Sequence, residues 1–333
     1  MPICTSCTHP TPFLYTVYNT ENNLRLEQCS NCGSFADPYV EHDTLTLILD
    51  LILLKRDVYR HLLFNRGSGV RRLGEDLNKE ENKKPTISDG AREREKARQW
   101  HLLKLAAVLI TVDAFIRWTH LGVSQPFDAT RIDLATWNAQ ATQGFLRVFI
   151  GCLVETLAFH IGIVIACYIL LHALDYVNSR KSNPPPISGI RQQFRYSLVP
   201  LSLLYSSLTK LFLLFLLSIW RPETSKAEIR PLPPQFNASH MFTNPVLLSA
   251  IEILDEDRLD REWVVRNVLG GMAAGFGLRV VLDCAPVYTT MVILVGWGVK
   301  TIVANLVSQW VGVHTGLADE QTTGEMWLAY SIP

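Results

Sequence analysis

The chain has 333 residues, with 31 Lys or Arg balanced by 31 Asp or Glu, so its formal net charge is zero. This balance argues against a nucleic-acid-binding protein, because such proteins carry a basic surface for phosphates. Apolar residues make up 48% of the chain. A soluble enzyme with a large core could also reach that share, but here the apolar residues arrive in long blocks. The distribution predicts a protein that crosses a membrane several times.

The first 43 residues are polar and contain two pairs of cysteines, Cys4 with Cys7 and Cys29 with Cys32. Two residues between the members of a pair let a tight turn present both thiols to one ion. Four thiolates suit Zn²⁺ or an iron centre. A closed shell of four ligands leaves no open position, so we expect structural and not catalytic zinc.

Two strand-like runs, 13–18 and 24–29, flank a turn-rich segment and predict a hairpin that brings the cysteine pairs together. Gly33, directly after the second pair, permits the positive φ that such turns often need. Residues 1–43 are therefore expected to form a small β zinc ribbon. Three histidines are alternative ligands, although four cysteines already saturate such a site: His9, His42 and His61.

Residues 44–65 predict an apolar helix too short to cross a bilayer, which lies in the interface or packs under the ribbon. Residues 66–100 are rich in both signs of charge and predict a solvated cytosolic linker. Residues 1–40 contain no apolar stretch typical of a cleavable signal peptide, so we expect an internal span to direct membrane entry.

Five apolar blocks follow, each near the length that crosses about 30 Å of hydrocarbon. Tryptophans stand near many of their ends, as interfacial anchoring predicts; they are Trp100, Trp118, Trp220, Trp263 and Trp310. The fold class expected is mainly α, a polytopic helical membrane bundle over 101–312, followed by a C-terminal tail at 313–333. The five spans are expected at about 102–122, 146–174, 198–220, 263–283 and 287–310.

Loop charge predicts the orientation of the spans. The linker before the first span and the 175–197 loop are rich in Lys and Arg, whereas the loop between the first two spans carries only Arg131. Cytosolic loops hold the excess of basic residues, so we expect the N-terminus in the cytosol. The 221–262 loop is then lumenal. It contains the candidate glycosylation site Asn237, in Asn-Ala-Ser, which agrees with that orientation.

Charged and titratable residues also lie inside the predicted spans, where a central charge costs on the order of 3 kcal/mol. Asp113 and Arg117 are four apart, so they share a helix face and can form an ion pair. The functional interpretation is a polar path or lipid-headgroup site between helices, and the alternative is buried ion pairing alone. The residues concerned are Asp113, Arg117, Glu155, His160, Lys210 and Lys300.

Two further patterns in the spans bear on packing and catalysis. Gly271 and Gly275 form a small-xxx-small pair, which predicts a close approach between helices. Glu155 and His160 are five apart, about 140° around a helix, so they are not expected to share a face. No nucleophile with a neighbouring base and no phosphate-binding loop is recognisable, and we therefore expect no enzyme activity.

The N-terminal motifs closely resemble the homology domain of the Arv family over residues 3–66. Beyond that segment the resemblance is one of architecture only, a charged linker followed by several spans. The residues that carry the resemblance are Cys4-Thr-Ser-Cys7, Leu24-Arg-Leu26, Cys29-Ser-Asn-Cys32-Gly33, Ala36–Asp43, Leu49–Lys55 and Tyr59–Asn65.

The resemblance implies a multi-pass protein of the endoplasmic-reticulum membrane, with the Golgi membrane as a second location. It implies a role in intracellular sterol transport and sphingolipid homeostasis, and in glycosylphosphatidylinositol-anchor assembly. The expected partners are membrane lipids, namely sterol, sphingolipid and glycolipid intermediates. The alternative is a zinc-ribbon scaffold that docks proteins of lipid synthesis without moving lipid itself.

Overall fold

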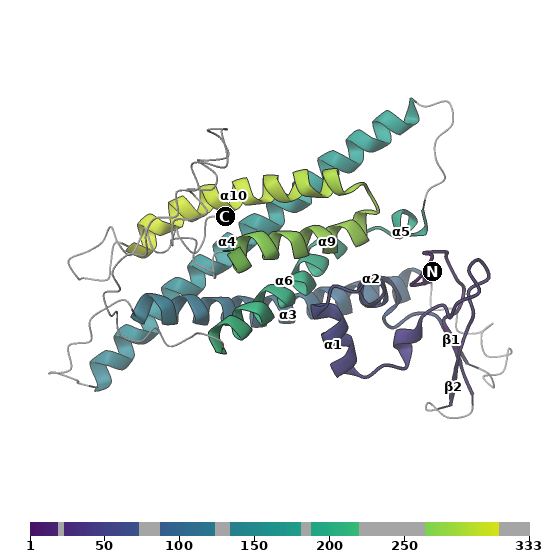
Figure 1. The fold of residues 1–333 in the computed structure, drawn as a ribbon, viewed down its shortest axis with the longest axis horizontal. Helices are drawn as coiled ribbons and strands as arrows, with labels where there is room; N and C mark the ends of the chain where they lie inside the picture. Colours follow the sequence, from purple (N-terminus) through teal and green to yellow (C-terminus); the bar gives the residue numbers. More distant parts are fainter. Residues whose placement is uncertain (19–22, 73–86, 124–133, 181–187, 220–263, 313–333) are drawn as a thin grey trace, which may run out of the picture.

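A small N-terminal module lies at one end of a bundle of long helices in the computed structural model (Figure 1). The strands of the module are at the right in that view, and the helices extend from them toward the left. The structure describes residues 1–18, 23–72, 87–123, 134–180, 188–219 and 264–312.

The module contains a three-stranded sheet with the order β2-β1-β3. β1 (Tyr15–Val17) pairs antiparallel with β2 (Leu24–Leu26), which confirms the predicted hairpin with shorter strands. β3 (Val70–Arg72) pairs parallel with β1, inside the segment expected to be a solvated linker. Part of residues 66–100 is therefore regular secondary structure, because β3 joins the sheet and the first long helix begins at Ile87.

The single helix expected after Asp43 is two helices in the structure. α1 (Thr44–Ile52) begins at Asp43, whose carboxylate accepts a backbone N–H of the first turn at 3.2 Å, a common N-cap arrangement. Leu54 then adopts a φ of 56°, which is uncommon for a leucine. The chain reverses there into α2 (Arg56–Arg60), which continues through a π-helical turn, η2 (His61–Asn65).

α1 packs one face against α6 (Leu198–Ile219), where the Thr209 hydroxyl donates to the carbonyl of Ile52 at 3.0 Å. Its outward face is apolar and exposed, as is typical of a helix at a membrane interface. The residues of this α1 outer face are Leu45, Ile48, Leu49 and Leu53.

Within the described residues, five helical segments form the bundle, which confirms the predicted fold class. They are α3 (Ile87–Val123), α4 (Leu134–Ser179), α6, η4 (Val264–Leu269) continued by α9 (Gly270–Leu282), and α10 (Pro286–Gly312). Each is long and apolar enough to cross a membrane; the stretches concerned are Glu95–Trp118, Thr142–Ser179, Leu198–Leu217, Val264–Leu282 and Pro286–Ser308. A short helix, α5 (Gly189–Gln192), precedes α6.

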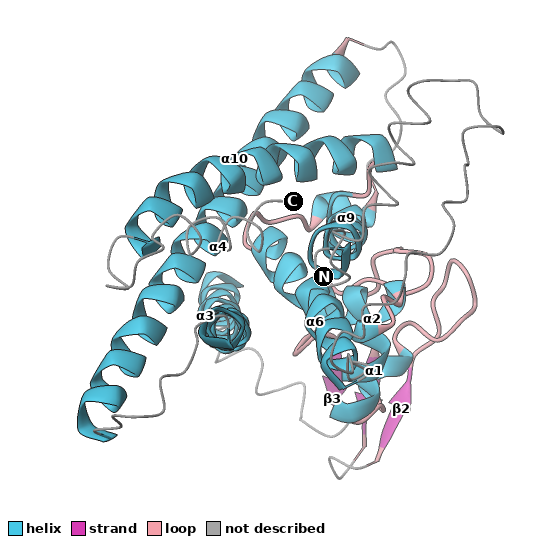
Figure 2. Ribbon diagram, turned by 60° about the vertical axis from the view of Figure 1, so that its left-hand side comes forward, coloured by secondary structure: helices cyan, strands magenta, loops and turns pink. Residues whose placement is uncertain are grey.

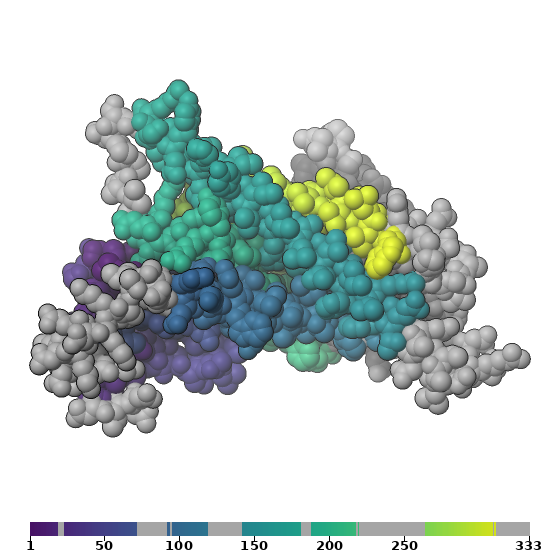
Figure 3. All heavy atoms as spheres, turned by 180° about the vertical axis from the view of Figure 1, so that it is seen from behind, coloured from purple at the N-terminus to yellow at the C-terminus, as the bar shows by residue number. Residues whose placement is uncertain are grey.

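α4 packs along α10 and α3, while α6 packs along α9. Figure 2 shows α3 nearly end-on between α4 and α6, and Figure 3 shows the surface that α3, α4 and α10 form together. Ile161, Ile165 and Ile169 point outward from α4 at 56%, 54% and 61% exposure. Apolar side chains on the outside are what a lipid environment requires, and polar groups are then confined to the inside.

The predicted close approach at the glycine-rich run is only partly realised. A side chain at Gly271 would overlap the ring of Trp297, so α9 and α10 are in close contact there. A Cβ atom at Gly275 would meet nothing within 4 Å, so Gly275 takes no part in the contact. Gly277 instead faces α6, near the carbonyl oxygen of Ser202. The small residues of α9 thus allow close contact with α10 on one face, at Gly271, and with α6 on another, at Gly277.

Tyr59 of α2 connects the N-terminal module to the bundle by its ring contacts. It is fully buried and lies edge-on to Tyr205 of α6 and Phe276 of α9, with ring centroids 6.5 and 5.6 Å away. Tyr59→Ala should lower the free energy of unfolding by about 3–5 kcal/mol, because it leaves a large cavity. Thermal unfolding of the purified protein in detergent micelles measures the loss.

Tyr59→Phe is the matched control for this substitution. The Tyr59 hydroxyl is buried and has no hydrogen-bond partner among the described residues, so its removal should leave the protein at least as stable. A loss in Tyr59→Phe comparable to that in Tyr59→Ala would show that the hydroxyl, and not the ring packing, holds the two parts together.

Candidate metal centre and buried charge cluster

The two Cys-x-x-Cys turns have the same local geometry. In each, the residue after the second cysteine donates its backbone N–H to the carbonyl of the first, at 2.9 Å from Thr8 to Cys4 and 2.9 Å from Gly33 to Cys29. Thr8 and Gly33 also share a positive φ, of 65° and 71°, as expected for Gly33. The chain therefore builds two equivalent turns that can present their thiols to one point.

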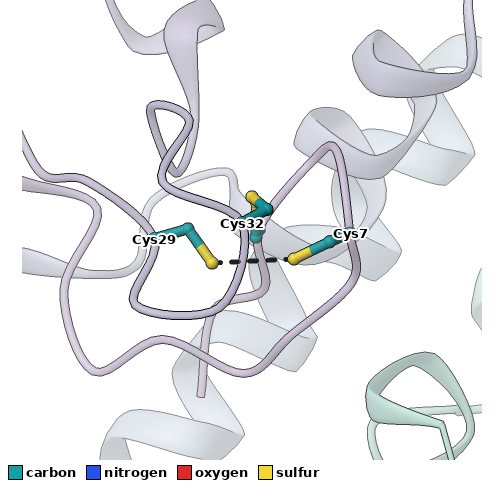
Figure 4. A group of neighbouring side chains, drawn as sticks. Cys7, Cys29 and Cys32 are labelled. Atoms are coloured by element: carbon teal, nitrogen blue, oxygen red, sulfur yellow. Dashed lines mark hydrogen bonds between the residues drawn. The ribbon is translucent and has the colours of Figure 1, made fainter.

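The four cysteine Sγ atoms lie within 4.8 Å of one another, and Figure 4 shows Cys7 and Cys29 pointing together. The separations are 3.7 Å for Cys4 and Cys32 and 3.6 Å for Cys7 and Cys29. Metal–sulfur bonds of about 2.3 Å around a tetrahedral ion place sulfurs about 3.8 Å apart, whereas a disulfide needs about 2.05 Å. The donor set fits one metal ion and does not fit two disulfides.

The thiols differ in how readily they ionise. Burial raises the pKa of the Cys4 thiol to about 12. Burial raises the pKa of the Cys7 thiol as well. Hydrogen bonds from the His9 backbone and the Asn31 side chain outweigh this effect and lower the pKa to about 6. A metal binds thiolates, so ion uptake must release the protons that the other thiols hold.

The α2–η2 segment holds the first cysteine turn by its backbone. The Asn65 amide donates to the carbonyl of Ile3 at 2.8 Å and accepts the Ile3 N–H at 2.9 Å. The Arg60 guanidinium donates to the carbonyls of Thr5 and Ser6, the latter at 2.8 Å. These two side chains were not singled out from the sequence, because they bond to backbone atoms far away along the chain. On its other side the turn meets α5, where Gly189 lies against the carbonyl of Thr8.

The histidines proposed as alternative ligands have other partners or lie outside the cysteine group. His61 Nδ1 is 2.7 Å from the buried carboxylate of Asp37, and His42 Nδ1 is 2.9 Å from the carbonyl of Pro38. His9 contributes no ligand atom to the group. Among the described residues, the only cluster able to hold a metal consists of the four cysteines.

A second site lies inside the bundle, where the six titratable residues predicted within the spans line one cavity of about 130 Å³. The expected pair is present, with Arg117 and Asp113 3.1 Å apart on α3. Arg117 also reaches the carboxylate of Glu155 on α4 at 3.0 Å. We refer to the residues in this cavity as the charge cluster: Asp113, Arg117, Glu155, His160, Lys210, Arg266 and Lys300.

Arg266 was absent from the sequence-based prediction. It lies in η4, near the beginning of the fourth span, and its guanidinium is 3.4 Å from Asp113. The sequence offered one sign of Arg266, a single charge among the apolar residues of Val264–Leu269. That sign is weak, because charged residues are common at the end of a span. Glu155 and His160 both line the cavity although they are five apart on α4, so the cavity reaches further around that helix than one face.

The candidate glycosylation site Asn237 lies outside the described residues. The predicted anchors Trp220 and Trp263 lie outside them as well. Trp100 and Trp310, at the ends of the first and last spans, are exposed as an interfacial position requires.

The bundle and the cysteine group define a polytopic helical membrane protein with an N-terminal module whose four cysteines could hold a metal ion. A profile described as the Arv1-like family matches residues 3–232. The chain belongs to the Arv1-like family.

Three relatives each match the chain over a short segment. The chain is 49% identical to protein arv1 of Schizosaccharomyces pombe over 63 residues and 46% identical to protein ARV1 of Saccharomyces cerevisiae over 63 residues. It is 36% identical to protein ARV1 of Homo sapiens over 62 residues. Each alignment covers 19% of this chain and 24%, 19% and 22% of the respective relative. No solved structure matches the chain.

Cys29→Ser should abolish metal binding, because the serine hydroxyl replaces one of four thiolate ligands and folding of such modules is coupled to the ion. Native mass spectrometry of the purified protein reads the bound ion as a mass difference. Cys284→Ser is the control, since Cys284 lies outside the cysteine group and its variant should keep the ion. Undiminished metal content in Cys29→Ser would contradict the assignment.

Arg117→Leu should lower the free energy of unfolding by about 3–5 kcal/mol, because it leaves the Glu155 and Asp113 carboxylates without their shared partner. Adding Glu155→Gln should restore part of the loss, since the amide needs no compensating charge. Chemical denaturation in detergent micelles compares these variants with Arg180→Leu, whose guanidinium is exposed. Equal losses in Arg117→Leu and Arg180→Leu would show that the ion pairs contribute nothing.

Proposed function

We propose that this protein mediates or regulates intracellular sterol transport and sphingolipid homeostasis in the endoplasmic-reticulum membrane, and that it aids glycosylphosphatidylinositol-anchor assembly. Membership of the Arv1-like family carries the proposal, because that family is linked to sterol and sphingolipid homeostasis. The five candidate spans and the polar cavity among them support a role inside a membrane. The chain spans 24% of the length of the S. pombe relative and 19% of that of the S. cerevisiae relative.

We further propose that the ion of the cysteine group is Zn²⁺ with a structural role and that the module faces the cytosol. Sulfur separations of 3.6 and 3.7 Å suit tetrahedral zinc. A reducing cytosol keeps thiols available for a metal. The closed shell then stabilises the turns that Arg60 and Asn65 hold against α2 and η2.

A second candidate function is a scaffold that docks proteins of lipid synthesis. It is favoured by the α1 outer face, where Leu45 and Leu53 are 65% and 67% exposed beside the module. An apolar surface of this kind binds either lipid tails or a partner protein. The transport function needs only the protein and lipid, whereas the scaffold function needs a partner, so the two can be separated.

The purified protein in liposomes should accelerate the transfer of fluorescent sterol to acceptor liposomes, if it moves lipid itself. Protein-free liposomes and liposomes with heat-unfolded protein set the background rate. A transfer rate equal to that background would remove the transport function and leave regulation or docking.

Leu45→Ser with Leu49→Ser tests the scaffold function in the full chain. Proximity labelling in cells should then lose proteins of lipid synthesis, while sterol transfer in liposomes is unchanged. Leu157→Ser is the matched control, because Leu157 is 50% exposed on α4, away from the module. The same labelled proteins with both variants would argue against docking by α1.

A further inference from the structure

The charge cluster contains more positive than negative side chains. Four cations face two carboxylates in one cavity, which leaves an excess of two positive charges when all six are ionised. The carboxylates belong to Asp113 and Glu155, and both are already engaged by arginines: Arg117 contacts each of them, and Arg266 approaches Asp113.

Lys210 of α6 and Lys300 of α10 account for the excess. Within the part of the chain that the structure describes, neither ammonium group has a hydrogen bond or an ion pair. Both lie inside candidate spans, where an uncompensated charge costs on the order of 3 kcal/mol. The stem of Lys210 packs beside Gly270 of α9, so the side chain is directed into the cavity that it lines.

The cavity also presents an unused polar atom. His160 Nε2 is buried and has no hydrogen-bond partner among the described residues, and His160 lines the same cavity. Its other ring nitrogen, Nδ1, lies 2.7 Å from the carbonyl of Thr156, which fixes the orientation of the ring. Because the carbonyl of Thr156 can only accept, Nδ1 carries the proton, and Nε2 of the neutral ring is an acceptor. The two ammonium groups therefore supply the hydrogen bonds to an anion, and Nε2 can accept one from a protonated oxygen of the same group.

The size and location of the cavity indicate what kind of anion it takes. About 130 Å³ is smaller than pockets that enclose a whole ligand, so the site suits a compact group such as a phosphate. The lining includes Leu109, Ile110 and Leu211 as well as the charges. A free anion would have to enter a bundle whose surface is apolar, whereas a lipid brings its phosphate along with tails that stay among the helices.

We propose that this cavity binds the phosphate of an anionic lipid headgroup, with Lys210 and Lys300 as its cationic partners. The inference rests on the proposed function in lipid homeostasis and names the ligand class of this cavity. A sterol does not fit that class, because its neutral hydroxyl does not compensate two positive charges. The test of this inference measures the binding of a phospholipid, whereas the test of the proposed function measures the transfer of a sterol. The failure of one can therefore be distinguished from the failure of the other.

Binding can be measured by native mass spectrometry and by thermal unfolding of the full chain with added lipid. Phosphatidate should bind and raise the melting temperature, as any ligand of the folded state does, and phosphatidylcholine and sterol should bind far more weakly. Lys210→Met with Lys300→Met should weaken phosphatidate binding about 100-fold, because two charged hydrogen bonds are lost. Lys210→Arg with Lys300→Arg keeps the charge and should bind within about tenfold of the parent protein.

Lys104→Met is the matched control for surface electrostatics. Lys104 also lies on a span, but its ammonium sits 5.1 Å from the ring of Trp100, outside the cavity. Its variant should bind phosphatidate as the parent protein does.

Three results would overturn the proposal. One is equal binding of phosphatidate and phosphatidylcholine by the parent protein, which needs no variant to interpret. Another is unchanged phosphatidate binding in the doubly methionine-substituted protein. The third is inorganic phosphate binding as tightly as phosphatidate, because that would assign the site to a soluble anion and not to a lipid.

Discussion

Arg117 occupies the position on which the rest of the bundle depends. Inside hydrocarbon a charge has no water to stabilise it, so a carboxylate on one helix must meet a cation on another. Arg117 meets Asp113 on its own helix and Glu155 on α4, which sets the rotation of α3 and α4 about their axes. Once those faces turn inward, isoleucines such as Ile161 and Ile165 must turn outward to the lipid.

The N-terminal module is continuous with this bundle and does not form a core of its own. Tyr59 and Leu63 of the module belong to the same apolar core as Leu278 of α9. The first cysteine turn is held by Arg60 and Asn65, which extend from the same helical segment as Tyr59. An ion that orders the turns therefore acts on a surface that packs directly against two spans.

Local patterns made much of this structure predictable. The apolar blocks indicated the spans, and the cysteine spacing indicated the metal group, because both signals reside in neighbouring residues. β3 escaped prediction because its pairing of Val70 with Tyr15 is non-local, and its charged sequence resembles a linker. The break at Leu54 carries no glycine to mark it. Lys210 and Lys300 were expected in a polar site between helices, whereas Arg266 escaped prediction because it lies near the beginning of the fourth span.

The contact between Thr8 and Gly189 has a consequence for the order of assembly during synthesis. The first cysteine turn is synthesised before α5, its neighbour, which follows the second candidate span and precedes the third. Contacts between such distant residues form late, because a long loop must close first. The first cysteine turn therefore lacks this neighbour until the first two candidate spans have been synthesised.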